Sequence, residues 1–169
     1  MQAQAPRRTD LGDTFALLVV AAVILVADQL TKALVVANID PGERIDVIGD
    51  VVQLWHAQNA GAAFSLFQGG LLLFLVVSVV ALAMVAYFHR AFRGESRWLQ
   101  LILGMVLGGT LGNLVDRIRL GYVTDFLSVG IGQTRWPTFN VADSALVVGI
   151  GLLVIYLAFL DHGREHQPA

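Results

Sequence analysis

The chain has no cysteine and few charged residues: of its 169 residues, 14% are Asp, Glu, Lys or Arg, whereas 56% are hydrophobic. The absence of cysteine excludes disulfides, thiol nucleophiles and thiolate metal ligands. The scarcity of charge excludes an ordinary soluble domain, in which about 25% of residues are charged. The sequence has no basic stripe with interleaved aromatic residues, so nothing in it supports nucleic-acid binding. The composition therefore indicates a membrane protein.

Four long apolar runs account for this composition. A bilayer core about 30 Å thick is crossed by roughly 20 residues of helix. The runs of suitable length are residues 15–36, 71–88, 98–115 and 141–160. Because the connections are short and no linker-like stretch separates the runs, residues 1–169 are expected to form one integral membrane domain, mainly α. The first run follows two arginines as a cleavable signal peptide would, but its helical pattern continues past Asp28, which favours a retained span.

Arginines are distributed unequally between the two ends of these spans. Six lie on the side that carries both termini, and four lie on the other side. Since cytoplasmic loops are the richer in Lys and Arg, both termini are predicted to be cytoplasmic. Residues 38–69 and 117–140 then lie outside. From Glu43 to Trp55 apolar residues partly alternate around a Gly-Asp turn, which predicts a β-hairpin that lies at the membrane surface and caps the helix ends.

Seven polar residues fall at the outer ends of the spans, where a carboxylate reaches water more cheaply than at the bilayer centre. They are Asp28, Lys32, Asn113, Asp116, Arg117, Asn140 and Asp143. Each has a structural interpretation. Asp28 and Lys32, spaced i, i+4, could form only an ion pair, and the three residues of the third span share a helix face as a polar knot would. Asn140 could simply cap the fourth span, with Asp143 in its first turn. The convergence of all seven on one rim favours a functional site.

Glycines on the third span predict close helix packing. They recur every four residues, at Gly104, Gly108 and Gly112. This spacing lets a second helix approach backbone to backbone, and it is expected to bring the fourth span against the third. Asp143 could then approach a carboxylate near the end of the third span.

Asp143 has two candidate partners, Asp116 and Asp125. Two carboxyls within a few ångströms cannot both ionise, so such a pair holds one proton near neutral pH. The pair can then hydrolyse a peptide bond, because the ionised member takes a proton from the attacking water while the protonated member binds the scissile carbonyl. A small proton-coupled carrier that uses the aspartates as relay groups is the alternative, although the sequence has no convincing repeat of two halves.

Five motifs, in order, resemble those of the bacterial lipoprotein signal peptidases, also called signal peptidase II. The motifs are D-Q-L-T-K from Asp28, N-A-G-A-A-F from Asn59, G-G-T-L-G-N-L-V-D-R from Gly108, V-T-D-F from Val123 and F-N-V-A-D from Phe139. Any one of them is weak evidence, whereas five in the family's order over residues 28–143 are specific.

The resemblance implies a four-helix aspartyl peptidase of the bacterial inner membrane, with a small periplasmic β-cradle at about residues 38–69. Such an enzyme cuts prolipoproteins just before a diacylglyceryl-modified cysteine, works among membrane lipids without a metal or other cofactor, and is inhibited by globomycin-type compounds. The catalytic pair of the family falls on Asp125 and Asp143. Its supporting positions fall on Asp28, Lys32, Asn59, Asn113, Asp116, Arg117 and Asn140.

The sequence adds one argument for Asp125 over Asp116 as the partner of Asp143. Arg117 and Arg119 follow Asp116 closely, and a cation would hold that carboxylate ionised and unable to share a proton. Asp116 is then expected to be structural, to pair with an arginine and to position the loop that carries Asp125.

The segment after the predicted hairpin is expected to contact substrate. Asn59, like Asn140, could donate a hydrogen bond to the substrate backbone or to the developing oxyanion. Gly61 would let the backbone approach the peptide closely. The apolar residues from 62 to 67 are interpreted as a flap that holds the substrate; alternatively, they merely lead into the second span.

Overall fold

The computed structural model describes residues 10–61, 71–94 and 96–164. Its long helices are α1 (Asp10–Asn38), α2 (Leu71–Phe92), α3 (Arg97–Leu120) and α4 (Val141–Arg164). All four are long and apolar enough to cross a membrane, which confirms the prediction of four spans. Each helix extends beyond at least one of its predicted limits, and for α3 the cause is a local cap at each end. For α3, the Ser96 side chain accepts a hydrogen bond from the N–H of Leu99 at one end, and Gly121 adopts a left-handed conformation at the other.

Helix α3 packs against each of the other three helices and is the most buried of the four. The prediction that the fourth span packs against the third is confirmed, but two of the three regularly spaced glycines, Gly104 and Gly108, face α1 and not α4. A Cβ added at Gly108 would lie 2.7 Å from the carbonyl oxygen of Ala21. The contact with α4 is made through Gly109, where an added Cβ would lie 2.5 Å from the carbonyl oxygen of Ala142. Gly112 also faces α4, since an added Cβ there would lie 3.0 Å from Cβ of Ala142, so Gly109 and Gly112 together let α4 approach α3.

Replacing Gly108 by alanine is expected to lower the free energy of unfolding by about 1 to 3 kcal/mol, because the new methyl group forces α1 and α3 apart. Thermal unfolding of the purified protein in detergent measures this effect. Gly151→Ala is the matched control, since an added Cβ at this position of α4 meets nothing within 4 Å. Equal melting temperatures for the two variants would contradict the close α1–α3 contact.

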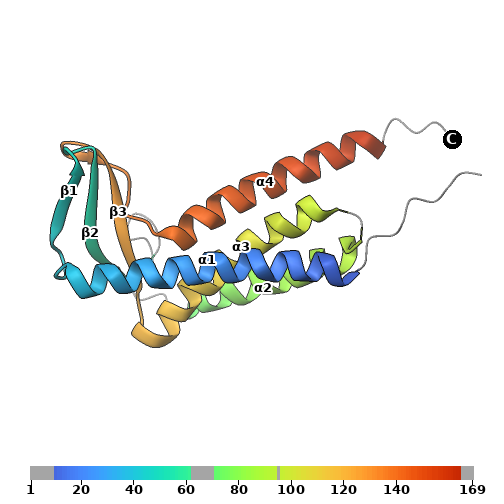
Figure 1. Cartoon of the computed structure of the whole chain (residues 1–169), viewed down its shortest axis with the longest axis horizontal. Coiled ribbons are helices and arrows are strands. Elements are labelled where there is room, and N and C mark those ends of the chain that lie inside the picture. Colours follow the sequence, from blue (N-terminus) through green and yellow to red (C-terminus); the bar gives the residue numbers. More distant parts are fainter. Residues whose placement is uncertain (1–9, 62–70, 95, 165–169) are drawn as a thin grey trace, which may run out of the picture.

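A four-stranded antiparallel sheet lies at one end of the helices (Figure 1). Its strands are β1 (Arg44–Ile48), β2 (Val52–Asn59), β3 (Val123–Ile131) and β4 (Thr134–Arg135), in the spatial order β1-β2-β3-β4. The predicted hairpin is confirmed as β1 and β2. The predicted limits of the cradle, residues 38–69, are too narrow, because β3 and β4 come from the segment between α3 and α4. Asp125 consequently lies on strand β3, opposite Ala57, and not on a loop as predicted.

A small apolar core joins the sheet to the helices. Val35 and Ile39 near the end of α1 pack against Phe126 of β3, and Leu54, Leu127 and Val141 surround them. The backbone N–H groups of Phe126 and Leu127 both bind the carbonyl oxygen of Phe139, just before α4 begins. These contacts hold β3 beside the first turn of α4, as Figure 1 also shows.

Candidate active site

The first turn of α4 is closed by a reciprocal cap. The side-chain oxygen of Asn140 accepts a hydrogen bond of 2.8 Å from the N–H of Asp143, and the carboxylate of Asp143 accepts one of 3.2 Å from the N–H of Asn140. The interpretation of Asn140 as a helix cap is thus confirmed. The same cap fixes the direction in which the side chain of Asp143 leaves the helix.

The amide group of Asn140 also reaches the second carboxyl. Because its oxygen is bound to the N–H of Asp143, its nitrogen must point the other way, where it donates to Oδ1 of Asp125 at 2.7 Å. The same nitrogen lies 3.1 Å from Oδ1 of Asn113 and 3.4 Å from the carbonyl oxygen of Thr124. Asn140 therefore bridges Asp125 and Asp143. With its amide protons directed at acceptors inside the protein and only 1% of its surface exposed, Asn140 is placed to hold the two carboxyls and not to bind substrate.

Each carboxyl oxygen of the two aspartates accepts a hydrogen bond. The second oxygen of Asp125 accepts one from Nδ2 of Asn59 at 2.8 Å, and Oδ1 of Asp143 accepts one from Nδ2 of Asn113 at 2.7 Å. The amide of Asn59 is itself oriented, since its oxygen accepts the N–H of Gly61 at 3.0 Å. The predicted flap, residues 62–67, lies outside the described residues.

Lys32 forms the centre of a buried ionic cluster under the pair. Its Nζ lies 2.8 Å from a carboxylate oxygen of Asp28 and 2.9 Å from one of Asp116. The predicted ion pair between Asp28 and Lys32 is confirmed. The expectation that an arginine pairs with Asp116 is wrong: Lys32 arrives from α1, 84 positions away in the chain. Lys32 also donates to Oδ1 of Asn113 at 3.1 Å, so the nitrogen of that amide is turned towards Asp143.

The carboxylates of this cluster also bind backbone near the pair. Asp28 accepts the N–H of Ala142 in the first turn of α4 at 2.9 Å, and Asp116 accepts the N–H of Thr124 on β3 at 3.1 Å. Sequence reasoning missed Gln29, whose amide nitrogen contacts both Asp28 and Asp116, at 3.2 and 3.0 Å. A polar residue next to Asp28 in an otherwise apolar span was the available signal, because such a residue needs a partner.

Both aspartates of the pair line one cavity of about 670 Å³. It lies where α2, α3, α4 and β3 meet, and apolar side chains make up much of its wall. Besides the two aspartates, its wall includes Asn59, Gly61, Phe74, Arg117, Trp136 and Val147. All ten residues singled out from the sequence therefore lie in the cavity wall or in the hydrogen-bonded layer under it. Among the residues that the structure describes, no group of His, Asp or Glu side chains is arranged to hold a metal ion.

Burial raises the pKa of Asp125 from its ordinary value of 3.8 to about 7, and the nearby charge of Asp143 acts in the same direction. Hydrogen bonds from Asn59 and Asn140 and the charge of Lys32 partly oppose this rise. Asp125 is therefore able to hold a proton near neutral pH. When two carboxyls share a cavity and hold one proton between them, the protonated one can act as an acid and the ionised one as a base in hydrolysis.

Comparison with known proteins gives a consistent set of relatives. The family model described as signal peptidase (SPase) II matches residues 20–159. A lipoprotein signal peptidase of Halothermothrix orenii is 42% identical over 139 residues, which cover 82% of this chain and 92% of the relative. One of Rhodococcus jostii is 48% identical over 145 residues, which cover 82% of this chain and 70% of the relative.

Two solved structures share the fold. Both are described as bacterial membrane enzymes studied by the in meso method. The first, at 2.3 Å resolution, has a TM-score of 0.84 and 25% sequence identity, and the match covers 98% of this chain and 99% of the other. The second, at 1.9 Å resolution, has a TM-score of 0.76 and 27% identity, with 91% and 97% covered.

Proposed function

The chain belongs to the signal peptidase II family, and on that premise we propose that Asp125 and Asp143 are its catalytic pair. As a lipoprotein signal peptidase the protein removes signal peptides from prolipoproteins, and its relatives give no support to a proton-coupled carrier. One observation carries the choice of the pair. Asn140 binds both carboxyls at the wall of one cavity, through its side chain to Asp125 and through its backbone N–H to Asp143.

In the proposed reaction the free enzyme holds one proton, on Asp125. A water molecule attacks the carbonyl carbon of the scissile bond and gives a proton to ionised Asp143, while Asp125 gives its proton to the carbonyl oxygen. The resulting gem-diol is neutral. When it collapses the C–N bond breaks, Asp143 passes its proton to the leaving nitrogen, and a gem-diol hydroxyl returns a proton to Asp125. The pair thus ends each turnover in its starting state.

The remaining polar residues hold the pair in place. Lys32 orients Asn113, and Asn113 in turn holds Asp143. The other two carboxylates of the ionic cluster bind the backbone of the segments that carry the pair, at the start of α4 and on β3. Such a supporting layer keeps reacting groups within the narrow geometry that catalysis requires. Asn59 supports Asp125 from β2, and Gly61 lines the cavity where a peptide would pass.

The mixed character of the cavity suits a lipid-modified peptide. The apolar side chains of Phe74, Trp136 and Val147 share its wall with the two carboxyls. A diacylglyceryl-modified cysteine would keep its acyl chains in the surrounding lipid while the bond before it reaches the pair. The same cavity is the expected binding site for globomycin-type inhibitors.

We place the site at the outer face of the inner membrane, with both termini in the cytoplasm. Helix α1 begins and α4 ends at the end of the bundle opposite the sheet (Figure 1). The excess of arginine on the side of the termini supports a cytoplasmic location for that end. The cradle and the catalytic pair then lie on the side where prolipoproteins are delivered.

Cleavage of a purified precursor tests this function. The protein in detergent is expected to cut a prolipoprotein that carries diacylglyceryl-cysteine, and mass spectrometry should find the modified cysteine at the new N-terminus. The same precursor without the lipid is the control and should remain uncut. Equal cleavage of both precursors, or cleavage at another bond, would contradict the assignment.

The dependence of cleavage on pH follows from the raised pKa of Asp125. Below about 7 this carboxyl keeps its proton, and above it the proton is lost. We therefore expect kcat/KM to fall as the pH rises through about 7, by about tenfold for each further pH unit, because the pair then lacks its acid. Samples held at high pH and assayed at pH 6 should recover full activity, which distinguishes titration from unfolding. A profile that stays flat from pH 6 to 9 would contradict the single-proton mechanism.

A further inference from the structure

Arg117 carries a positive charge close to Asp125 and Asp143 but forms no ion pair with either carboxylate. It lies in the last turn of α3, half-buried, and lines the cavity together with Asp125 and Asp143. Both carboxylates are near enough to act on its charge. Yet Arg117 forms no ion pair with any residue that the structure describes, whereas Lys32 binds two carboxylates.

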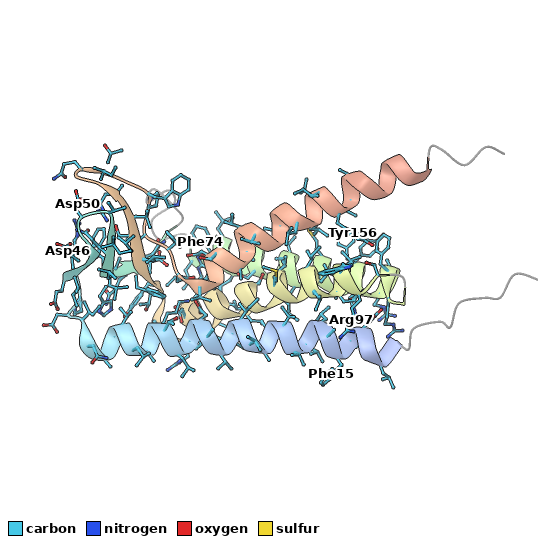
Figure 2. The ribbon with its side chains drawn as sticks, turned by 45° about the horizontal axis from the view of Figure 1, so that its top comes forward. Phe15, Asp46, Asp50, Phe74, Arg97 and Tyr156 are labelled. Atoms are coloured by element: carbon cyan, nitrogen blue, oxygen red, sulfur yellow. The ribbon has the colours of Figure 1, made fainter. Side chains whose placement is uncertain are left out.

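The guanidinium group of Arg117 is held by an aromatic ring instead. Its carbon lies 4.8 Å from the centre of the Phe74 ring, within the distance of about 6 Å at which a cation is attracted to the face of a ring. Phe74 belongs to the first turn of α2 and lines the cavity from that helix. Figure 2 shows it at the end of the bundle next to the sheet.

We propose that Phe74 is a positioning residue, which holds the guanidinium of Arg117 on the cavity wall and so keeps this cation from pairing with Asp125 or Asp143. The proposal rests on the assignment of these two aspartates as the catalytic pair. Phe74 lies outside the five motifs that define the family resemblance.

The charges around the pair explain why this arrangement matters. The ionisable groups in this region are the pair itself, Asp125 of β3 and Asp143 of α4, and four neighbours: Asp28 and Lys32 of α1 and Asp116 and Arg117 of α3. Helix α2 adds no charged group to the cavity among its described residues. Lys32 is already bound to two carboxylates, whereas Arg117 is paired with none among the described residues. Arg117 is therefore the cation that could form an ion pair with Asp125 or Asp143. If its guanidinium moved onto Asp125, it would stabilise the ionised form and remove the proton that the pair shares.

The test compares pH profiles of kcat/KM for cleavage of the diacylglyceryl-modified precursor. Phe74→Leu removes the ring and keeps an apolar side chain. The fall in activity at alkaline pH should then begin about 1 pH unit lower, because a nearby cation lowers the pKa of a carboxyl by about 1 unit or more. Phe74→Tyr keeps the ring and should retain the wild-type profile. Phe88→Leu makes the same substitution near the far end of α2, among core residues, and should leave the profile unmoved.

A second comparison shows whether the effect passes through Arg117. In an Arg117→Gln background, Phe74→Leu should shift the profile no further, because no cation remains to be released. If Phe74→Leu does not yield folded protein, Phe74→Met serves the same comparisons.

An unshifted profile in a folded Phe74→Leu variant would overturn the proposal, as would a shift of equal size in the Arg117→Gln background. Either result leaves the catalytic pair in place, provided that Asp125→Asn and Asp143→Asn each abolish cleavage. Full activity of those asparagine variants would instead overturn the proposed function itself. The two failures are therefore distinguishable.

Discussion

Replacement of Asp143 or Asp125 by asparagine is expected to reduce kcat for precursor cleavage at least about 10³-fold, within the range that acid–base groups contribute. Asparagine keeps the shape of the side chain but can neither take the proton of the attacking water nor supply one to the carbonyl oxygen. The measurement is turnover of the diacylglyceryl-modified precursor in detergent. Asp46→Asn is the matched control, since this carboxylate lies on the exposed strand β1 and does not line the cavity, whose wall residue Phe74 lies closer to the helices (Figure 2).

Loss of activity must be separated from loss of fold, because both substitutions disturb hydrogen bonds. Asp125 accepts amide N–H groups on both of its oxygens, from Asn59 and Asn140. An asparagine there would turn its own NH₂ group towards a donor, which leaves a buried polar group without a partner and costs about 1 to 3 kcal/mol. Melting temperatures and elution profiles therefore accompany the kinetics. A folded variant of either aspartate that retains wild-type turnover would refute the pair.

Replacement of Lys32 by methionine is expected to destabilise the protein by about 3 to 5 kcal/mol, because it leaves two buried carboxylates without their cation. Asp28 is fully buried and Lys32 is 4% exposed, so water cannot substitute for the lost charge. For a chain of this length the melting temperature should fall by about 6 to 20 °C. Catalysis should fall as well, since Asn113 loses the contact that turns its amide towards Asp143.

A combined variant isolates the electrostatic cause of this loss. Adding Asp28→Asn and Asp116→Asn to Lys32→Met removes the two uncompensated charges, and part of the lost melting temperature should return. Lys32→Met alone, if it melts at the wild-type temperature, would show that the buried cluster does not carry the stability assigned to it. Failure of the triple variant to recover any stability would mean that the hydrogen bonds of the cluster, and not its charges, hold α1, α3 and α4 together.

Features with a local cause are predicted well from the sequence. The four spans follow from runs of apolar residues, and the β1–β2 hairpin follows from alternation on either side of a Gly-Asp turn. The cap of α4 is also local, because Asn140 and Asp143 are only three positions apart. The helix limits are predicted less well, since hydropathy marks the part of a helix that suits lipid while the backbone remains helical until a cap ends it.

Features that depend on distant partners are predicted poorly. Arginines adjacent to Asp116 in sequence suggested its partner, but the partner is Lys32, which another helix brings to the same place. The glycine stripe correctly indicates close packing, but periodicity cannot say which helix fills it. Nothing in the sequence marked Phe74 as a functional residue, because an aromatic residue in an apolar span cannot be told from a lipid-facing side chain.

Taken alone, the sequence determined that the chain crosses a membrane four times and that its polar groups gather at one end of the bundle, because hydropathy and spacing act along the chain. The tertiary structure decided which of these groups meet. Strand β3 pairs with β2 and is anchored beside the first turn of α4, and this pairing directs Asp125 to the amide that also caps Asp143. The direction of a side chain at the junction of β3 and α4 depends on strand register and on helix contacts, and neither can be predicted from the neighbouring residues in the sequence.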